Sequence, residues 1–228
     1  MDIQKWAEEI QKDVWNEWKR NYNFIEAGFK VFFGPVVKNP KMMIITLNPG
    51  GGKERFENED KPNFENGDFS PPKINAYISS PKPGPMSRNM RMFFSERMDL
   101  LENSVAFTST FFRSKNLKEL KKSMEKYKFL EMEYFCSKKV KNIIETLEPK
   151  FIFVGGIRTY RKLREVLGLF DEEDYIRSND RLIAIKSRWN GIKIFTTIHP
   201  TGARVKKEDK LKIKELLWKD YENSETPV

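Results

Sequence analysis

Residues 42–52 read MMIITLNPGGG, an apolar run that stops abruptly at Asn48-Pro49 and three glycines. A run that is apolar on both faces is typical of a strand buried in a parallel sheet. Proline and glycine cannot continue such a strand, so they mark its end. The segment therefore predicts a buried strand with a tight loop at its carboxyl end.

Outward from this segment, strands and helices alternate along the chain. Further strands are expected at 104–112, 151–154, 182–186 and 192–198, and helices at 2–20, 87–101, 116–148 (interrupted near Lys128), 157–167 and 207–222. Asn190-Gly191 separates the last two strands, which predicts either a hairpin or two strands with a reversed edge. Residues 53–88 lack periodicity and predict a long loop. The alternation predicts an α/β fold with a mainly parallel sheet, and 228 residues suit a single domain over 1–228.

The chain is basic. Lys and Arg number 42 against 33 Asp and Glu, a net charge of +9, and the pI is about 9.4. Such an excess favours an anionic partner: a nucleic acid, a phosphorylated ligand or a membrane surface. The excess gathers at 113–141, with ten basic residues against four acids, and at 204–219, with seven against three. Either run could contact phosphates or form a solvated helix face.

Several classes of chemistry lack their residues. The single Cys136 excludes an internal disulfide and four-cysteine metal sites, and the single His199 excludes multi-histidine motifs. A phosphate-binding loop would need Gly where Leu47 stands and Ser or Thr where Glu54 stands. There is no Gly-x-Ser-x-Gly elbow, and Cys136 lies in an expected helix without features that activate a thiol. We therefore expect neither a metal nor a cofactor.

The sequence also bears on location. No apolar run approaches the length of a membrane span, and the first residues lack the apolar core of a secretory signal. We therefore expect an intracellular, cytoplasmic protein without membrane contact.

Polar residues follow the expected strands. Ligands of open parallel sheets bind at the carboxyl ends of the strands, where Asn48, Ser109 and His199 would lie. An amide, an imidazole and glycine-loop amides can orient a water, bond to a base edge and stabilise a developing anion. The alternative is that Asn48 caps a turn and His199 is a buried structural histidine.

The same residues resemble motifs of the uracil-DNA glycosylase superfamily. Leu47-Asn48-Pro49-Gly50-Gly51 resembles its first motif, in the Asn-Pro-Gly form of the mismatch-specific and single-strand-selective branches. His199-Pro200-Thr201-Gly202-Ala203-Arg204 resembles its second motif. Val105–Arg113 is similar to its middle strand and Phe151–Gly156 to its third, and the order agrees over about residues 40–220.

This resemblance implies a three-layer α/β/α sandwich with a central four-stranded, mainly parallel sheet. It implies a monomer that binds double- or single-stranded DNA and hydrolyses the N-glycosidic bond of a flipped uracil or related deaminated base. Asn48 would hold the attacking water, and His199 would bond to the pyrimidine O2. The implied base pocket consists of Leu47, Pro49, Gly50, Phe56 and Ser109. The implied DNA contacts are Thr201, Gly202, Ala203, Arg204, Lys206 and Lys207.

The chain also departs from the family pattern. Ser109 replaces an amide that reads the uracil edge, Ala203 is small for a residue that enters the duplex, and residues 54–68 carry six acids against two bases. The single cysteine separates the chain from the iron–sulfur branches. The stacking aromatic is Phe56, Phe64 or Phe69, with Phe56 nearest the first motif. Two alternatives stay open: a catalytically silent member that binds nucleic acid, a nucleobase or a nucleotide, and an unrelated α/β protein with a small ligand.

Overall fold

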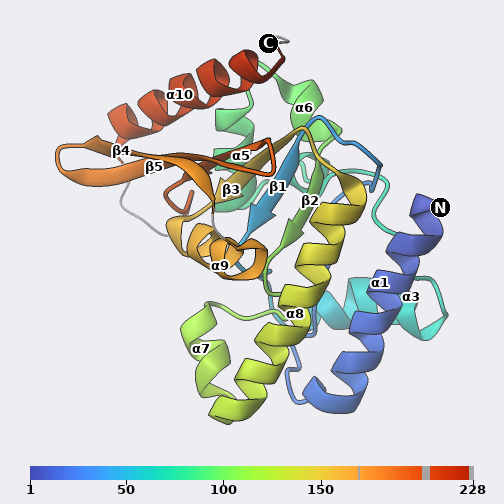
Figure 1. Cartoon of the computed structure of the whole chain (residues 1–228). Coiled ribbons are helices and arrows are strands. Elements are labelled where there is room, and N and C mark those ends of the chain that lie inside the picture. Colours follow the sequence, from blue (N-terminus) through green and yellow to red (C-terminus); the bar gives the residue numbers. More distant parts are fainter. Residues whose placement is uncertain (169, 202–205, 226–228) are drawn as a thin grey trace.

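The computed structural model describes residues 1–168, 170–201 and 206–225, and in this part of the chain the strands form one six-stranded mixed sheet flanked by helices (Figure 1). The strands are β1 Met43–Thr46, β2 Val105–Thr108, β3 Phe151–Gly155, β4 Asp171–Ser178, β5 Arg181–Trp189 and β6 Ile192–Thr197. Their order is β2-β1-β3-β6-β5-β4. The first four are parallel, whereas β5 runs antiparallel to both β6 and β4. The expected α/β class is confirmed.

The sheet has two strands more than the four that the resemblance implies, and one more than the five expected from the sequence pattern. The Asn190-Gly191 turn has positive φ at both residues (+48° and +82°), as a tight hairpin turn requires, and it joins β5 to β6. Strand β4 then pairs with β5 as the edge of the sheet. Its sequence, DEEDYIRS, carries only two apolar residues, because an edge strand is half exposed. Because of this polar composition, the sequence pattern did not predict β4.

Helices cover both faces of the sheet. One buried cluster joins α1 (Ile3–Glu17), α8 (Lys126–Leu147) and α9 (Ile157–Leu167) to side chains such as Ile45 and Val154. The other joins α5 (Pro85–Phe93), α6 (Met98–Glu102) and α10 (Lys207–Glu225) to the opposite side chains of the same strands, such as Ile44 and Phe153. None of the described helices is long and apolar enough to cross a membrane.

Several helix boundaries differ from the expected ones, and α10 continues to Glu225, three residues beyond its expected end. The first helix is capped by Asp2, whose Oδ1 accepts from the Gln4 N–H at 3.0 Å, and continues as the π-helical turn η1 (Trp18–Tyr22). The expected 116–148 helix divides into α7 (Leu117–Lys122) and α8, which begins at Lys126, just before the expected interruption. The expected 87–101 helix divides into α5 and α6.

The expected long loop at 53–88 is wrong over its first third. Residues 53–65 are continuously helical, as α2 (Lys53–Arg55), η2 (Phe56–Asp60) and α3 (Lys61–Glu65), and α4 (Ala76–Ser79) follows further on. Phe56, Asp60 and Phe64 are buried at intervals of four residues, one on each successive turn. This inward face is narrow and includes an aspartate, so surrounding acidic residues obscured the periodicity.

Candidate functional site

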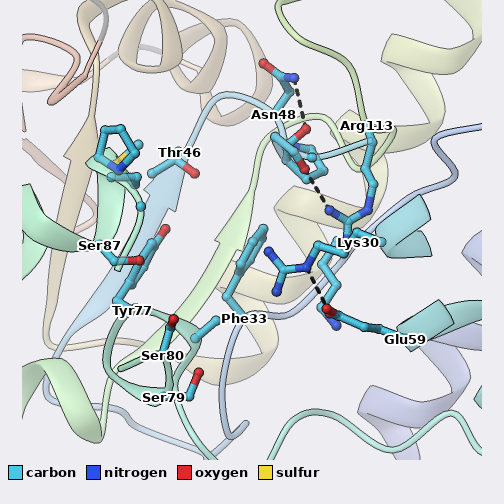
Figure 2. A pocket seen from close by; sticks show the side chains of 18 of the residues that line it. Lys30, Phe33, Thr46, Asn48, Glu59, Tyr77, Ser79, Ser80, Ser87 and Arg113 are labelled. Carbon is cyan, nitrogen blue, oxygen red and sulfur yellow. Dashed lines mark hydrogen bonds and ion pairs between the residues drawn. The ribbon is translucent and has the colours of Figure 1, made fainter. Parts of the chain in front are cut away.

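A cleft of about 940 Å³ lies at the carboxyl ends of the parallel strands (Figure 2). Three strand-end loops contribute to its wall: Asn48–Gly51 after β1, Arg113–Lys115 after β2, and His199 with Thr201 after β6. Residues from α2, η2 and the segment 72–87 complete the lining. Asn48 and His199 therefore line one cleft, although they are 151 positions apart in the sequence. This agrees with the expectation that loops at the carboxyl ends of parallel strands meet in one crevice.

The Asn48 side chain has a fixed orientation. Its Nδ2 donates to the main-chain oxygen of Ser114 at 3.0 Å and to Ser114 Oγ at 3.2 Å (Figure 2). A carboxamide held by its nitrogen presents its oxygen as a hydrogen-bond acceptor. In the described part of the chain Oδ1 receives no hydrogen bond. The amide oxygen is therefore suited to accept a hydrogen bond from a ligand, for example from a water O–H.

The contacts of His199 assign its tautomer. The main-chain N–H of Thr201 donates to His199 Nδ1 at 3.2 Å, and Thr201 Oγ1 lies 3.2 Å from the same nitrogen. A nitrogen that accepts from an N–H is unprotonated, so the neutral ring carries its proton on Nε2. Burial lowers the pKa of His199 from its ordinary value, which favours this neutral form. The ring is therefore a neutral Nε2–H donor at pH 7.

Gly156 lets the backbone after β3 approach the imidazole. A Cβ on Gly156 would lie 3.4 Å from His199 Cδ2, and the glycine has a φ of +122°. This backbone angle disfavours any residue other than glycine.

A buried ion network braces the loop that follows Asn48. The Arg113 side chain is 2% exposed and donates through Nη2 to Asp60 Oδ2 at 2.7 Å and through Nη1 to the Gly50 carbonyl at 2.7 Å. Lys30 Nζ lies 2.6 Å from the other Asp60 oxygen. Burial lowers the pKa of Arg113, and the charge of Asp60 opposes that shift. The network fixes the glycine loop to η2 and to the end of β2.

Arg113 was not anticipated as part of the site. It directly follows the apolar strand segment SVAFTSTFF, and a charge placed there signals a buried partner. Gly51 belongs to the same arrangement, because a Cβ there would lie 2.8 Å from Arg113 Nη1 and its φ is +99°.

Two aromatic rings that sequence analysis missed line the cleft. The rings of Phe33 and Tyr77 are parallel within 1°, with centroids 6.2 Å apart, and Figure 2 shows them side by side. Burial raises the pKa of Tyr77 to about 12, and a hydrogen bond with Thr46 opposes the shift. Phe33 precedes β1, and Tyr77 lies in α4 within the expected loop, so neither stood beside a recognised motif. Arg91 fixes this region by donating to the carbonyls of Tyr77, Ile78 and Ser80.

Three expected base-pocket residues lie outside the cleft. Phe56 is 1% exposed and packs on Trp18, at a centroid distance of 5.1 Å, because η2 turns it into the core. Ser109 is also buried, and its Oγ donates to the Leu47 carbonyl at 2.9 Å, which joins the two loops internally. Leu47 itself packs against the core. Pro49 and Gly50 do line the cleft.

The other candidate stacking rings also face the core. Phe64 and Phe69 stack on one another, with centroids 5.6 Å apart and planes 11° apart, and neither lines the cleft.

The expected DNA-binding loop is described in part. Thr201 lines the cleft, and Lys206 and Lys207 are exposed where α10 begins. Gly202, Ala203 and Arg204 lie outside the described residues.

Charges around the cleft are mixed but mostly positive. The lining includes five basic residues, Lys30, Arg55, Lys82, Arg113 and Lys115, and two acids, Glu54 and Glu59. Arg55 Nε lies 2.9 Å from Glu59 Oε2, so this exposed pair is mutually neutralised. The acids of 54–68 are thus partly compensated at the wall itself.

Two other chemistries are constrained by the described residues. Among them, no three His, Cys, Asp or Glu side chains gather closely enough to hold a metal ion. Cys136 is fully buried, and burial raises the pKa of its thiol to about 11, which makes it a poor nucleophile at neutral pH.

Comparison with known proteins identifies no relative: no protein-family model matches the chain, and no curated protein does.

Proposed function

We propose that this protein is a DNA glycosylase-like hydrolase that cleaves the N-glycosidic bond of a flipped uracil or related deaminated base. The observation that carries the proposal is that the Asn48 amide and the His199 imidazole line one cleft at the carboxyl ends of parallel strands. The motif resemblance assigns both residues to that chemistry. The parallel arrangement of β2-β1-β3-β6 within the six-stranded sheet supports the proposal, because it brings the strand-end loops to one edge.

The hydrolysis needs an oriented water and a stabilised leaving group. The water oxygen attacks C1′ of the deoxyribose as the bond from C1′ to the base nitrogen breaks, and the bonding electrons leave with the base. Asn48 Oδ1 would accept a water O–H and aim its oxygen, while Ser114 holds Nδ2. The proton lost by the water passes to solvent. Asn48 acts by position, because a carboxamide is too weak a base to take the proton.

His199 would act on the leaving base. A neutral imidazole that donates from Nε2 can bond to the pyrimidine O2, where negative charge grows as the bond breaks. The Thr201 N–H to Nδ1 contact and the lowered pKa of His199 both favour this donor form. Phe33 and Tyr77 supply aromatic surface on the wall for a flat base.

A panel of oligonucleotides tests the proposal. Strands with uracil opposite guanine, uracil in single strands, hypoxanthine, or thymine in a mismatch are incubated with excess protein and treated with alkali. We expect strand cleavage at one or more of these bases in the wild type and its loss in Asn48→Ala. Intact strands across the whole panel, at high protein concentration, would reject the proposal.

A second candidate is a catalytically silent protein of the same fold that binds a nucleic acid, nucleobase or nucleotide. The observation that favours it is that Ser109, at the position that would read the uracil edge, is buried against the Leu47 carbonyl and does not line the cleft. It predicts a gel shift without abasic-site formation, which the same panel detects.

A further inference from the structure

The outer side of α8 carries large apolar side chains that the core does not use. Tyr127, Leu130 and Tyr134 are 55%, 55% and 64% exposed. Their spacing of three and four residues puts them on one side of the helix, and we call them the α8 aromatic face. The opposite side of α8 is already packed, with Phe129, Met132 and Cys136 buried.

This clustering is unusual for the molecule. Nine large apolar side chains are exposed among the described residues, and three of them share these two turns of α8. Scattered exposed apolar residues are normal, whereas a group on one face indicates an interaction site.

Exposed lysines accompany the α8 aromatic face. Exposed Lys126, Lys138 and Lys141 lie on α8 with it, exposed Lys118, Lys121 and Lys122 lie on the neighbouring α7, and Lys138 Nζ lies 4.4 Å above the Tyr134 ring. The exposed acids on the same two helices are fewer, namely Glu119, Glu125, Glu131 and Glu145, and Glu145 pairs with Lys141. The net charge is positive, so the partner that complements it is anionic. A symmetric contact with a second copy would instead bring lysine against lysine.

Rings interleaved with lysines fit a single nucleic-acid strand. Unpaired bases offer π-faces that stack on tyrosine, while lysines contact the phosphates. In a duplex the bases already stack on one another, so exposed rings would add little there. The two features together therefore favour single-stranded over double-stranded nucleic acid.

The helices that carry this face follow the cleft directly along the chain. Lys115 lines the cleft, α7 begins two residues later at Leu117, and α8 follows at Lys126. Figure 1 shows α7 and the first turns of α8 together, at the end of the molecule toward which β1 and β2 point. A strand that leaves the cleft past Lys115 would meet the lysines of α7 and then Tyr127, Leu130 and Tyr134.

We propose that the α8 aromatic face binds the single-stranded flank of a nucleic acid whose target base occupies the cleft. The nucleic-acid interaction rests on the surface itself, whereas the link to a target base rests on the function proposed above.

Fluorescence anisotropy of the full chain with a labelled oligothymidylate of about 20 nucleotides tests the proposal. We expect the variant Tyr127→Ala/Tyr134→Ala to bind this strand about tenfold more weakly or worse, as loss of base stacking does. The single variant Tyr134→Trp keeps a stacking ring at this position and should bind the strand with wild-type affinity. The control Tyr175→Ala removes a tyrosine that is 45% exposed on β4 and should bind like the wild type. Affinity for a duplex of the same length should change less than affinity for the single strand.

The outcomes separate this inference from the proposed function. Tyrosine-dependent binding of the strand, without excision of any base in the panel, supports the α8 face and rejects the glycosylase. Excision together with unchanged binding by Tyr127→Ala/Tyr134→Ala overturns the α8 proposal alone. Equal losses for duplex and single strand also overturn it, because rings that stack on unpaired bases should matter less for a duplex. Sedimentation that shows a wild-type dimer and a monomeric double variant assigns the face to self-association and also overturns it.

Discussion

The loops that carry Asn48 and His199 are held in place in different ways. The Asn48 loop is fixed by residues far away in the sequence: Ser114 holds the amide, and Arg113, anchored on Asp60, holds the Gly50 carbonyl. In the His199 loop, by contrast, ring Nδ1 accepts from the main-chain N–H of Thr201, two positions on.

Because of this difference, we expect different substitutions to displace the Asn48 amide and the His199 imidazole. The amide depends on a buried ion network, so a change at Arg113 should disturb it from outside its own loop. The imidazole depends on its own loop, with Gly156 packed beside it, and should be indifferent to that network. The protein has a single histidine, so one imidazole NMR signal reports on the second loop alone.

The largest expected effect is that of Arg113→Ala on stability. The change leaves Asp60 buried with only Lys30 as its charged partner and frees the Gly50 carbonyl, which should lower the free energy of unfolding by about 3 kcal/mol or more. Urea denaturation measures it. The control is Arg55→Ala, whose exposed pair with Glu59 should contribute less than about 1 kcal/mol.

If Arg113→Ala does not fold, Arg113→Lys keeps the charge and loses the forked geometry. Its histidine signal should titrate as in the wild type, because the network does not hold the His199 loop. A shifted histidine pKa in Arg113→Lys would break the distinction between the two loops.

Asn48→Ala comes next. We expect turnover to fall by about two orders of magnitude, as removal of one preorganised polar group does, with binding of damaged DNA nearly unchanged. Single-turnover excision assays and anisotropy measure the two quantities. The matched control is Asn58→Ala, an exposed asparagine that also lines the cleft and should leave turnover close to wild type. Equal losses in the two variants would mean that Asn48 has no special role.

Features encoded by neighbouring residues could be predicted from the sequence, whereas features that depend on contacts between distant residues could not. The strand ends at Asn48 and His199 were predictable, since an apolar run and its Pro or Gly stop lie within a few residues of each other. Strand β4 was not, because its polar sequence becomes a strand only through pairing with β5.

The residues that line the cleft also could not be predicted from neighbouring sequence alone. Phe56 lies close to the first motif, and proximity in sequence made it the favoured stacking ring, yet η2 turns it toward Trp18. Phe33 and Tyr77 reach the cleft through tertiary packing, with the Phe33 N–H bonded to the Ala106 carbonyl. The pairing of Arg113 with Asp60 spans 53 positions, and no local pattern encodes it.

The pH dependence of His199 is the third test. Burial lowers its pKa in the folded protein, so folding favours the neutral ring. The stability from this effect is present above the unfolded pKa of about 6.5 and is lost as pH falls through the lowered folded value. We expect the histidine signal to titrate below pH of about 6.5, with excision unaffected by this group at higher pH. A midpoint at or above that value would contradict the lowered pKa of His199.

The smallest expected effects come from the two hydroxyls, one in each loop. Ser114→Ala removes Oγ from Asn48, but the main-chain oxygen of residue 114 remains at 3.0 Å. Thr201→Val likewise removes Oγ1, but the main-chain N–H still donates to His199 Nδ1. In both loops the backbone is the partner that survives, so each variant should lose about 1 kcal/mol or less, at most a fivefold decrease in turnover. Thr201→Val should also leave the histidine titration where it is in the wild type. A loss in Ser114→Ala as large as that of Asn48→Ala would show that the hydroxyl, and not the carbonyl, holds the amide.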